Sequence, residues 1–141
     1  TGVQTCPLPI LKDIKKSKKF FTELGFSFDG AYSSEESIAL VIGDKNVVVM
    51  LFTESAFKNF TGNKISDSKN GTEVLFSIDA ESREEVDEMA KKVVKAGGIM
   101  FAEVGETDGW MYGCGFADLD GHKWNVLHMD MSKKKRTIYL G

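Results

Sequence analysis

FADLDGHKWNVLH, residues 116–128, is the stretch from which the architecture of the chain can be inferred. Its pair Asp120-Gly121 separates two runs of strand-forming residues, 111–117 and 123–129. An Asp-Gly pair supplies the positive φ values that a tight turn needs, so we predict a β-hairpin here.

The second strand of this hairpin has two different faces. Because side chains alternate along a strand, Trp124 and Val126 point to one face, whereas Asn125 and Leu127 point to the other. Both faces are largely apolar, which indicates that helices cover one of them and that the other lines a cavity. Asn125 is the polar group in the middle of that second face.

The composition is that of an ordinary globular protein, because 42% of the 141 residues are hydrophobic and 28% are charged. This length predicts one domain, or two small modules that share a core. The formal net charge of −3 gives no reason to expect nucleic acid or a membrane as a partner. The longest apolar run, residues 47–52, is too short to span a bilayer, and we expect no signal peptide at the start of the chain. We therefore expect a cytoplasmic protein with reduced thiols.

The two halves of the chain follow one pattern. Residues 3–11 predict a strand that Pro7 and Pro9 confine to a sheet edge, Asp13 predicts a helix N-cap, and three strands follow by residue 52. A short helix and a polar loop complete this half. In the second half, a strand that begins at Glu73 leads to an amphipathic helix and three more strands.

The repetition predicts an α+β fold of two βαβββ modules, module one at about residues 3–60 and module two at about residues 71–131. Asp79 takes the place of Asp13 in the repeat, and a glycine ends each helix. The alternative is a generic α+β domain whose elements merely alternate. Residues 1–131 then form one domain, and residues 132–141 form a basic tail that we interpret as solvated.

Three motifs resemble the vicinal-oxygen-chelate superfamily, which contains glyoxalase I, extradiol dioxygenases, and bleomycin- and fosfomycin-resistance proteins. They are D-x-x-x-S-x-x-F-F-x-x-L-G-F at residues 13–26, ID…E…AGG at residues 78–98, and F-x-D-x-D-G-x-x-W at residues 116–124. The resemblance covers about residues 6–130. Within the superfamily, REEVDEMAKKVVKAGG and MYGCGFADLDGHKW are most similar to bacterial proteins described as predicted lactoylglutathione lyases.

The resemblance implies a glyoxalase-like fold, in which curled mixed sheets surround a common cavity. In many members a divalent metal lies there, held by His, Glu or Gln from four strands, and stabilises an enediolate or a bound oxygen species. The four corresponding positions of this chain are Cys6, Met50, Glu73 and Asn125.

These four side chains are a poor set of ligands for a hard divalent ion, which prefers carboxylate and imidazole groups. The thioether of Met50 is decisive, so we predict neither a metal nor another cofactor. The two histidines do not replace the missing ligands: we expect His122 to be exposed after the turn and His128 to lie in the core, on the face opposite Asn125.

Two functions remain open. The first is an enzyme of glyoxalase ancestry, a lyase or isomerase that acts on a small molecule with Glu73 as its base and without the usual metal. The second is a non-catalytic protein that binds an aromatic or cationic molecule, as bleomycin-resistance proteins do. Phe52, Trp110, Tyr112 and Glu73 would then hold the ligand through stacking and charge. For each aromatic residue taken alone, core packing is the simpler explanation.

A second copy of the chain is the other partner that we expect. In the superfamily, two modules pair within one chain or between the two chains of a dimer. Either arrangement closes a sheet edge that would otherwise be unpaired, and we predict a homodimer.

Overall fold

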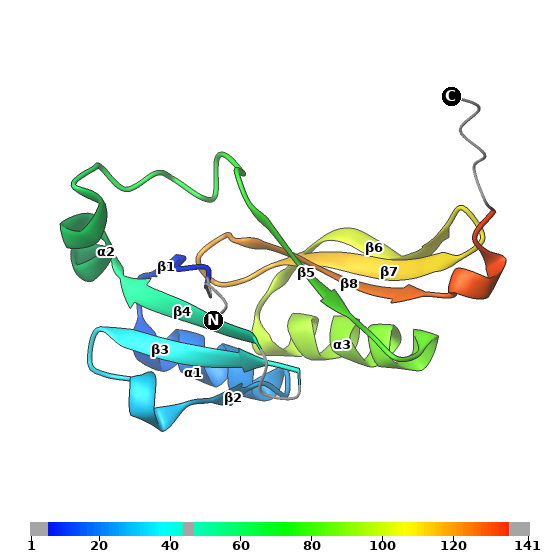
Figure 1. Ribbon diagram of the computed structural model, residues 1–141, viewed down its shortest axis with the longest axis horizontal. Helices are drawn as coiled ribbons and strands as arrows, with labels where there is room; N and C mark the ends of the chain where they lie inside the picture. The colour runs from blue at the N-terminus through cyan, green and yellow to red at the C-terminus, as the bar shows by residue number, and fades with distance from the viewer. Residues whose placement is uncertain (1–5, 44–46, 136–141) are drawn as a thin grey trace, which may run out of the picture.

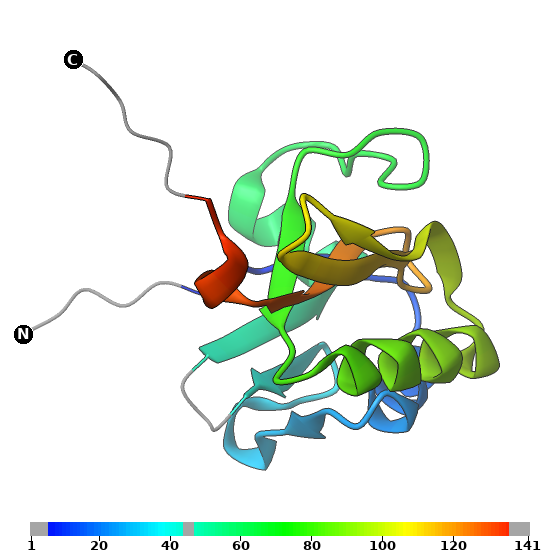
Figure 2. The same cartoon turned by 90° about the vertical axis from the view of Figure 1, so that its right-hand side faces the viewer.

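The computed structural model describes residues 6–43 and 47–135, which form two four-stranded mixed sheets with a helix packed against each (Figure 1 and Figure 2). The first sheet, sheet A, has the strand order β1-β4-β3-β2 and the second, sheet B, has the order β5-β8-β7-β6. The predicted α+β fold of two βαβββ modules is therefore confirmed. Neither sheet closes into a barrel. No helix among the described residues is long and apolar enough to cross a membrane.

The elements of module one are β1 Ile10–Leu11, α1 Ile14–Glu23, β2 Ser27–Phe28, a 3-10 turn Gly30–Tyr32, β3 Ser37–Ile42, β4 Val47–Thr53 and α2 Glu54–Thr61. Those of module two are β5 Leu75–Asp79, α3 Arg83–Ala96, β6 Ile99–Thr107, β7 Met111–Ala117, β8 Lys123–Met129 and a 3-10 turn Met131–Lys133. In each sheet the first strand runs parallel to the last strand, and the other pairs are antiparallel.

The first strand is shorter than predicted because of its prolines. Only Ile10–Leu11 forms a regular ladder with β4, and residues 3–5 lie outside the described part of the chain. Pro7 and Pro9 have no N–H to donate, but their carbonyls still accept hydrogen bonds from Met50 N (3.1 Å) and Phe52 N (3.0 Å). Residues 7–11 therefore follow β4 as an extended edge segment.

The two helices begin differently, which corrects the predicted equivalence of Asp13 and Asp79. The Asp13 side chain caps α1 by accepting a hydrogen bond from Lys16 N at 3.0 Å. Asp79 instead ends β5, and Ser82 caps α3 by accepting one from Glu85 N at 3.1 Å. The S-x-x-E pattern at Ser82–Glu85 is a helix-start signal that the repeat had obscured. Gly25 and Gly97 follow the helices with positive φ, as predicted.

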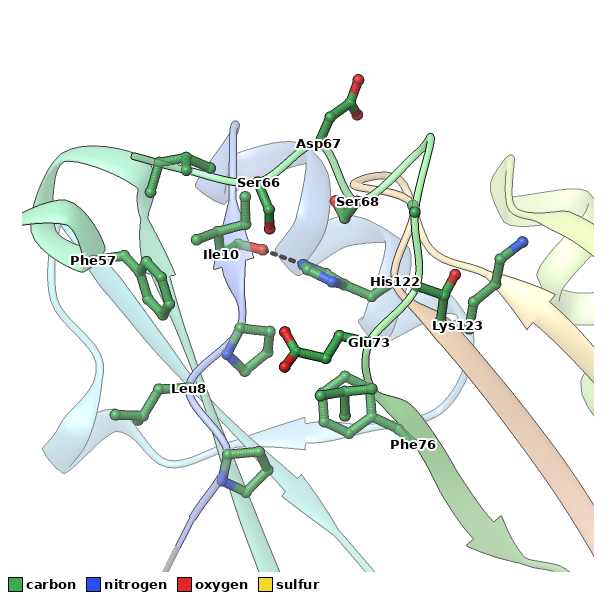
Figure 3. Close-up of a pocket in the computed structure, with 17 residues that line it drawn as sticks. Leu8, Ile10, Phe57, Ser66, Asp67, Ser68, Glu73, Phe76, His122 and Lys123 are labelled. Atoms are coloured by element: carbon green, nitrogen blue, oxygen red, sulfur yellow. Dashed lines mark hydrogen bonds between the residues drawn. The ribbon is translucent and has the colours of Figure 1, made fainter. Parts of the chain in front are cut away.

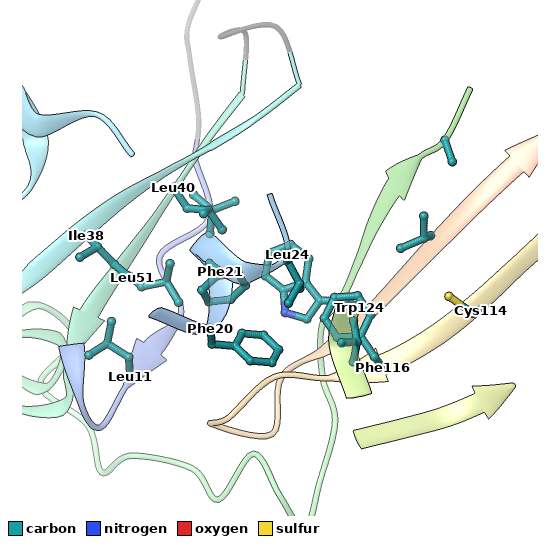
Figure 4. Close-up of a cluster of buried hydrophobic side chains, with 14 of the residues drawn as sticks. Leu11, Phe20, Phe21, Leu24, Ile38, Leu40, Leu51, Cys114, Phe116 and Trp124 are labelled. Atoms are coloured by element: carbon teal, nitrogen blue, oxygen red, sulfur yellow. The ribbon is translucent and has the colours of Figure 1, made fainter. Parts of the chain in front are cut away.

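One hydrophobic core joins the modules (Figure 4). Phe20 and Phe21 of α1 pack in module one and also reach the helix-facing side of sheet B. The Phe21 ring meets Trp124 edge-on with centroids 5.7 Å apart, and Trp124 stacks on Phe116 at 6.2 Å. The hairpin face that carries Trp124 and Val126 is thus the covered face, as predicted.

The β7–β8 hairpin is also confirmed, but its turn is longer than a tight Asp-Gly turn. Residues 118–122 lie outside the ladder, and Gly121 alone among them has a positive φ, of 86°. The buried carboxylate of Asp118 organises this loop. It accepts hydrogen bonds of 3.0 Å each from Asp120 N, His122 N and Trp124 Nε1. The loop geometry therefore depends on Asp118 as much as on the Asp-Gly pair.

Candidate functional site

A cavity with a volume of about 540 Å³ lies between the two modules (Figure 3). One wall is the segment 7–10 that ends in β1, together with Phe57 of α2. The opposite wall is formed by residues 71–74, Phe76 and the end of the β7–β8 loop, and residues 65–68 cover the space between the walls. We call this space the intermodule cavity.

Glu73 is the predicted site residue that lines this cavity. Its side chain is exposed to solvent, and its carboxylate points across the cavity toward the wall that carries Leu8 and Ile10 (Figure 3). The structure shows no ion pair to Glu73 among residues 6–43 and 47–135. The carboxylate is therefore available to a ligand.

His122 also lines the cavity, which corrects the expectation that it is an exposed residue after the turn. The side chain is half-buried, and its Nε2 lies 2.7 Å from the carbonyl oxygen of Ile10. Because a carbonyl only accepts, Nε2 must carry the hydrogen in this contact. His128 lies on the helix-facing side of β8, as predicted, with Nδ1 3.0 Å from Ala80 O.

The covering segment over the cavity is fastened to the hairpin. Ser68 Oγ donates a hydrogen bond of 2.7 Å to the carbonyl of Asp120. Ser68 belongs to a turn at residues 67–70, in which the Asp67 side chain accepts hydrogen bonds from Lys69 N (3.1 Å) and Asn70 Nδ2 (2.5 Å). The sequence predicted no role for this polar loop. Because the loop directly precedes Glu73 in the chain, its place near the site could have been inferred.

Asn125 lies in a different hollow, of about 290 Å³, on the face of sheet B that is opposite α3. We call it the sheet cavity; Leu75, Phe101, Gly113 and Gly115 also line it. The side-chain oxygen of Asn125 is buried and has no hydrogen-bond partner within the described residues. An unpaired buried acceptor costs about 1–3 kcal/mol, so this amide is stabilised when a donor is supplied.

Cys114 lies beside this hollow on β7 and is 4% exposed. Burial raises the pKa of the Cys114 thiol, with a smaller contribution from Asp87 and Glu103. The thiolate is the reactive form, so this environment keeps Cys114 unreactive.

Cys6, Met50 and Phe52 belong to neither cavity. Met50 and Phe52 lie on the face of sheet A that is opposite its core, because Val49 and Leu51 alternate with them toward the core. The Phe52 ring meets Phe60 of α2 edge-on at 5.1 Å. Cys6 is exposed, one residue before the cavity wall.

Trp110 and Tyr112 lie away from both cavities as well. Trp110 belongs to the β6–β7 turn, and Lys134 Nζ lies 5.0 Å from its ring centre. Tyr112 faces α3, where its hydroxyl donates a hydrogen bond of 2.7 Å to Asp87 and its ring lies 4.8 Å from the guanidinium of Arg83. The structure thus separates the predicted ligand-binding residues instead of gathering them around one cavity.

A family model described as "Glyoxalase/Bleomycin resistance protein/Dioxygenase superfamily" matches residues 10–126. The chain belongs to this superfamily. Comparison with curated proteins gave no match. The solved structures that resemble the chain include a hypothetical protein and a protein of unknown function, so the similarity fixes the fold and leaves the reaction open.

Three solved structures illustrate the similarity. Hypothetical protein SA1046 from S. aureus is 29% identical over 91% of this chain and 95% of its own, with a TM-score of 0.80. A glyoxalase/bleomycin resistance protein/dioxygenase family enzyme from Burkholderia phytofirmans PsJN is 16% identical over 87% and 95%, with a TM-score of 0.74. The fosfomycin resistance protein FosX from Listeria monocytogenes, complexed with Mn(II), is 18% identical over 94% of each chain, with a TM-score of 0.68.

The superfamily implies a metal site, and the residues of this chain do not fit it. Met50 offers a thioether, Glu73 lines the intermodule cavity and Asn125 lines the sheet cavity. Within residues 6–43 and 47–135, no group of three or more His, Cys, Asp or Glu side chains is placed to hold a metal ion. A hard cation would find one carboxylate at these positions, which is too few for stable binding.

Proposed function

We propose that this superfamily member binds a small organic molecule in the intermodule cavity without a metal. The observation that carries the proposal is the carboxylate of Glu73, which enters a cavity with largely apolar walls. Leu8, Ile10, Phe57 and Phe76 supply apolar surface on both sides. Cavities of this kind bind ligands through burial of apolar surface and orient them through a few polar groups.

The ligand that best matches these walls has an apolar body and a positively charged group. Glu73 has no ion-pair partner among the described residues, so a ligand cation would supply the missing charge. Lys123 also lines the cavity, but its Nζ lies 4.4 Å from the ring centre of Phe101 and points away from Glu73 (Figure 3). A hydrogen bond to a charged group contributes about 1.5–3 kcal/mol, which corresponds to roughly a tenfold or larger change in affinity.

The second candidate function is catalysis, as a lyase or isomerase similar to lactoylglutathione lyase, with Glu73 as the base. Two acid–base side chains, Glu73 and His122, line the same cavity, and this observation favours it. Isomerisation also needs a group that stabilises the negative charge on the substrate oxygen. The Nε2 hydrogen of His122 is already given to Ile10 O, which leaves non-catalytic binding as our first choice.

Calorimetric titration with 2-phenylethylamine and 2-phenylethanol tests the binding function, because these probes differ in charge and share an apolar ring. The amine should bind about tenfold more tightly, and Glu73→Gln should remove that preference. Glu35→Gln changes an exposed carboxylate of the β2–β3 connection and should leave the preference intact. Equal affinities for both probes, or no binding of either, would contradict the proposal.

The catalytic candidate is distinguished by turnover. A hemithioacetal substrate should be consumed by the native protein and left unchanged by Glu73→Gln, while the affinity of the variant for that substrate stays similar. Titration with Ni²⁺, Mn²⁺, Zn²⁺ and Fe²⁺, followed by thermal unfolding, checks the metal. A ligand that binds the folded state raises the melting temperature, so a clear rise with one metal would contradict the proposal that the site works without a metal.

We also propose a homodimer formed through the open face of sheet B, in a cytoplasmic protein. Leu75, Phe101 and Met129 are 51%, 46% and 43% exposed on that face, and a second copy would remove this apolar surface from water. Light scattering should give twice the monomer mass for the native protein and the monomer mass for Phe101→Glu; a monomeric native protein would contradict this.

A further inference from the structure

The main chain of the segment 7–12 alternates between two partners. The carbonyls of Pro7 and Pro9 point to β4, where they accept hydrogen bonds of 3.1 and 3.0 Å. The intervening groups point to module two. Ile10 O lies 2.7 Å from His122 Nε2, and Lys12 N donates to Asp120 Oδ1 at 2.9 Å.

This alternation places the main-chain N–H and C=O of Leu8 on the same side as those of Ile10 and Lys12, because successive residues of an extended strand point to opposite edges. Leu8 lines the intermodule cavity and its residue surface is 41% exposed. Within residues 6–43 and 47–135, neither main-chain group of Leu8 has a hydrogen-bond partner. One unpaired donor and one unpaired acceptor therefore face the cavity side by side.

The sequence Pro7-Leu8-Pro9 makes this arrangement specific. Proline has no N–H, so Leu8 carries the sole main-chain donor of these three residues. The N–H groups that the two prolines lack would have pointed toward β4, where the proline carbonyls accept hydrogen bonds from Met50 and Phe52. The donor on the cavity side is kept.

The opposite wall is also the edge of a sheet. β1 ends sheet A and β5 ends sheet B, and β5 pairs with β8 alone among the described strands. Figure 3 shows the two edges on either side of the cavity, with Glu73 and Phe76 opposite Leu8 and Ile10. An unpaired strand edge accepts an extended chain through main-chain hydrogen bonds, and neighbouring pockets select its side chains.

We propose that the ligand of the intermodule cavity is a peptide-like amide with a cationic side chain, which binds in extended form along Leu8. The ligand carbonyl accepts from Leu8 N–H, and the ligand N–H donates to Leu8 C=O. The cationic side chain crosses the cavity to Glu73, and its methylene groups pack on Phe57 and Phe76. This inference rests on the proposed binding function and names its substrate class.

Nα-acetyl-lysine methylamide is a probe with these groups, because its ε-ammonium is free and both of its backbone amides carry an N–H. Its analogue methylated on the two backbone nitrogens lacks these N–H donors. Calorimetry with the native protein should show at least about tenfold tighter binding of the unmethylated probe. Leu8→Pro removes the outward N–H that the ligand carbonyl uses and keeps the segment extended, so it should bind the unmethylated probe at least about tenfold more weakly than Leu8→Ala does. Leu8→Ala removes side-chain surface and keeps the N–H, so the ratio should survive.

2-Phenylethylamine separates this inference from the function on which it rests. It has no amide, so it should bind Leu8→Pro and Leu8→Ala, which both lack the leucine side chain, with affinities within about threefold of each other, which also shows that Leu8→Pro is folded. If the amine binds but the two lysine probes bind equally, the amide inference is wrong and the cation-binding function stands. If the unmethylated lysine probe binds Leu8→Pro and Leu8→Ala equally, the Leu8 N–H is not the contact. Slowed hydrogen exchange at Leu8 N–H on addition of the lysine probe provides a second check.

Discussion

The side-chain carboxylate of Asp120, in the β7–β8 loop, accepts a hydrogen bond of 2.9 Å from the main-chain N–H of Lys12. The two residues belong to different modules, so this contact connects them directly. The second oxygen of Asp120 accepts from Ser17 Oγ at 3.3 Å, at the start of α1. With the contact between His122 and Ile10, the loop holds both the last residues of the cavity wall and the first turn of α1. The loop thus sets the position of one cavity wall relative to the other.

Asp120→Ala should destabilise the fold by about 2–4 kcal/mol, because it removes two hydrogen bonds and leaves a partly buried N–H without a partner. Urea unfolding followed by tryptophan fluorescence measures this change. Asp79→Ala replaces an exposed carboxylate of the same module and should stay within about 0.5 kcal/mol of the native protein. A loss at position 120 as small as that at position 79 would show that the loop does not join the modules.

The glycines of β7 make a second prediction. A Cβ on Gly113 would lie 2.6 Å from the carbonyl oxygen of Val126, which belongs to the neighbouring backbone and cannot move freely. A Cβ on Gly115 would meet the Phe101 ring at 2.5 Å, and this side chain can swing away. Gly113→Ala should therefore cost about 1–3 kcal/mol and Gly115→Ala less.

Gly30→Ala is the matched control for both glycine variants, because a Cβ there meets no atom within 4 Å and φ is not positive. Thermal unfolding of the three variants should rank the loss of stability as Gly113, Gly115, Gly30. An equal loss at Gly113 and Gly30 would show that sheet B relaxes around the added methyl group.

The fold was predictable from the sequence because its signals are local and repeated. The Asp-Gly pair of the hairpin, the glycines after α1 and α3, and alternation along β8 each depend on residues close in the chain. The same alternation correctly assigned Trp124 to the core and Asn125 to the open face. The equivalence of Asp13 and Asp79 failed for the opposite reason, because element order does not fix which residue caps a helix.

The candidate site was less predictable because its walls come from segments far apart in the sequence. Nothing near His122 indicates that its ring reaches Ile10, and nothing near Ser68 indicates that it bonds to Asp120. Tyr112 shows a related problem. The sequence placed Tyr112 on a strand but did not show which face of the sheet carries its side chain. The ladder between β7 and β8 places it on the same face as His128, where its hydroxyl meets Asp87. Whether Cys6, Met50, Phe52 and Trp110 contact a ligand stays a prediction.

Tyr112 provides a prediction at alkaline pH. The hydrogen bond to Asp87 raises the pKa of the Tyr112 hydroxyl above its ordinary value of 10.0, and desolvation adds to the effect. The phenol is neutral while it donates this bond, so the contact stabilises the fold below pH 10 and is lost as the pH rises through the raised pKa. Asp87→Asn should lower the pH of this ionisation in a titration followed at 295 nm. Tyr112→Phe identifies the signal, and an unchanged midpoint in Asp87→Asn would assign the shift to another cause.

Asp118 provides a prediction at acid pH. Its pKa is raised, whereas that of a carboxylate in a surface ion pair is commonly lowered, so its effect on stability has the opposite dependence on pH. Burial raises the pKa of Asp118 above its ordinary value of 3.8, although the hydrogen bond from Trp124 and the nearby His122 act in the other direction. The folded state therefore binds this proton more tightly than the unfolded state does. The contribution of Asp118 to stability is largest below pH 3.8 and falls as the pH rises through its raised pKa.

Asp118→Asn cannot ionise, so comparison with the native protein isolates this effect. The variant also presents an amide N–H to Trp124 Nε1, a donor, and should be less stable at every pH. The difference in unfolding free energy between the two proteins should shrink as the pH rises from about 3.8 toward neutrality, because only the native protein loses stability through this residue. Urea unfolding at a series of pH values measures it. A difference that grows with pH would show that the Asp118 carboxylate is stabilised in the fold by its hydrogen bonds more than burial disfavours it.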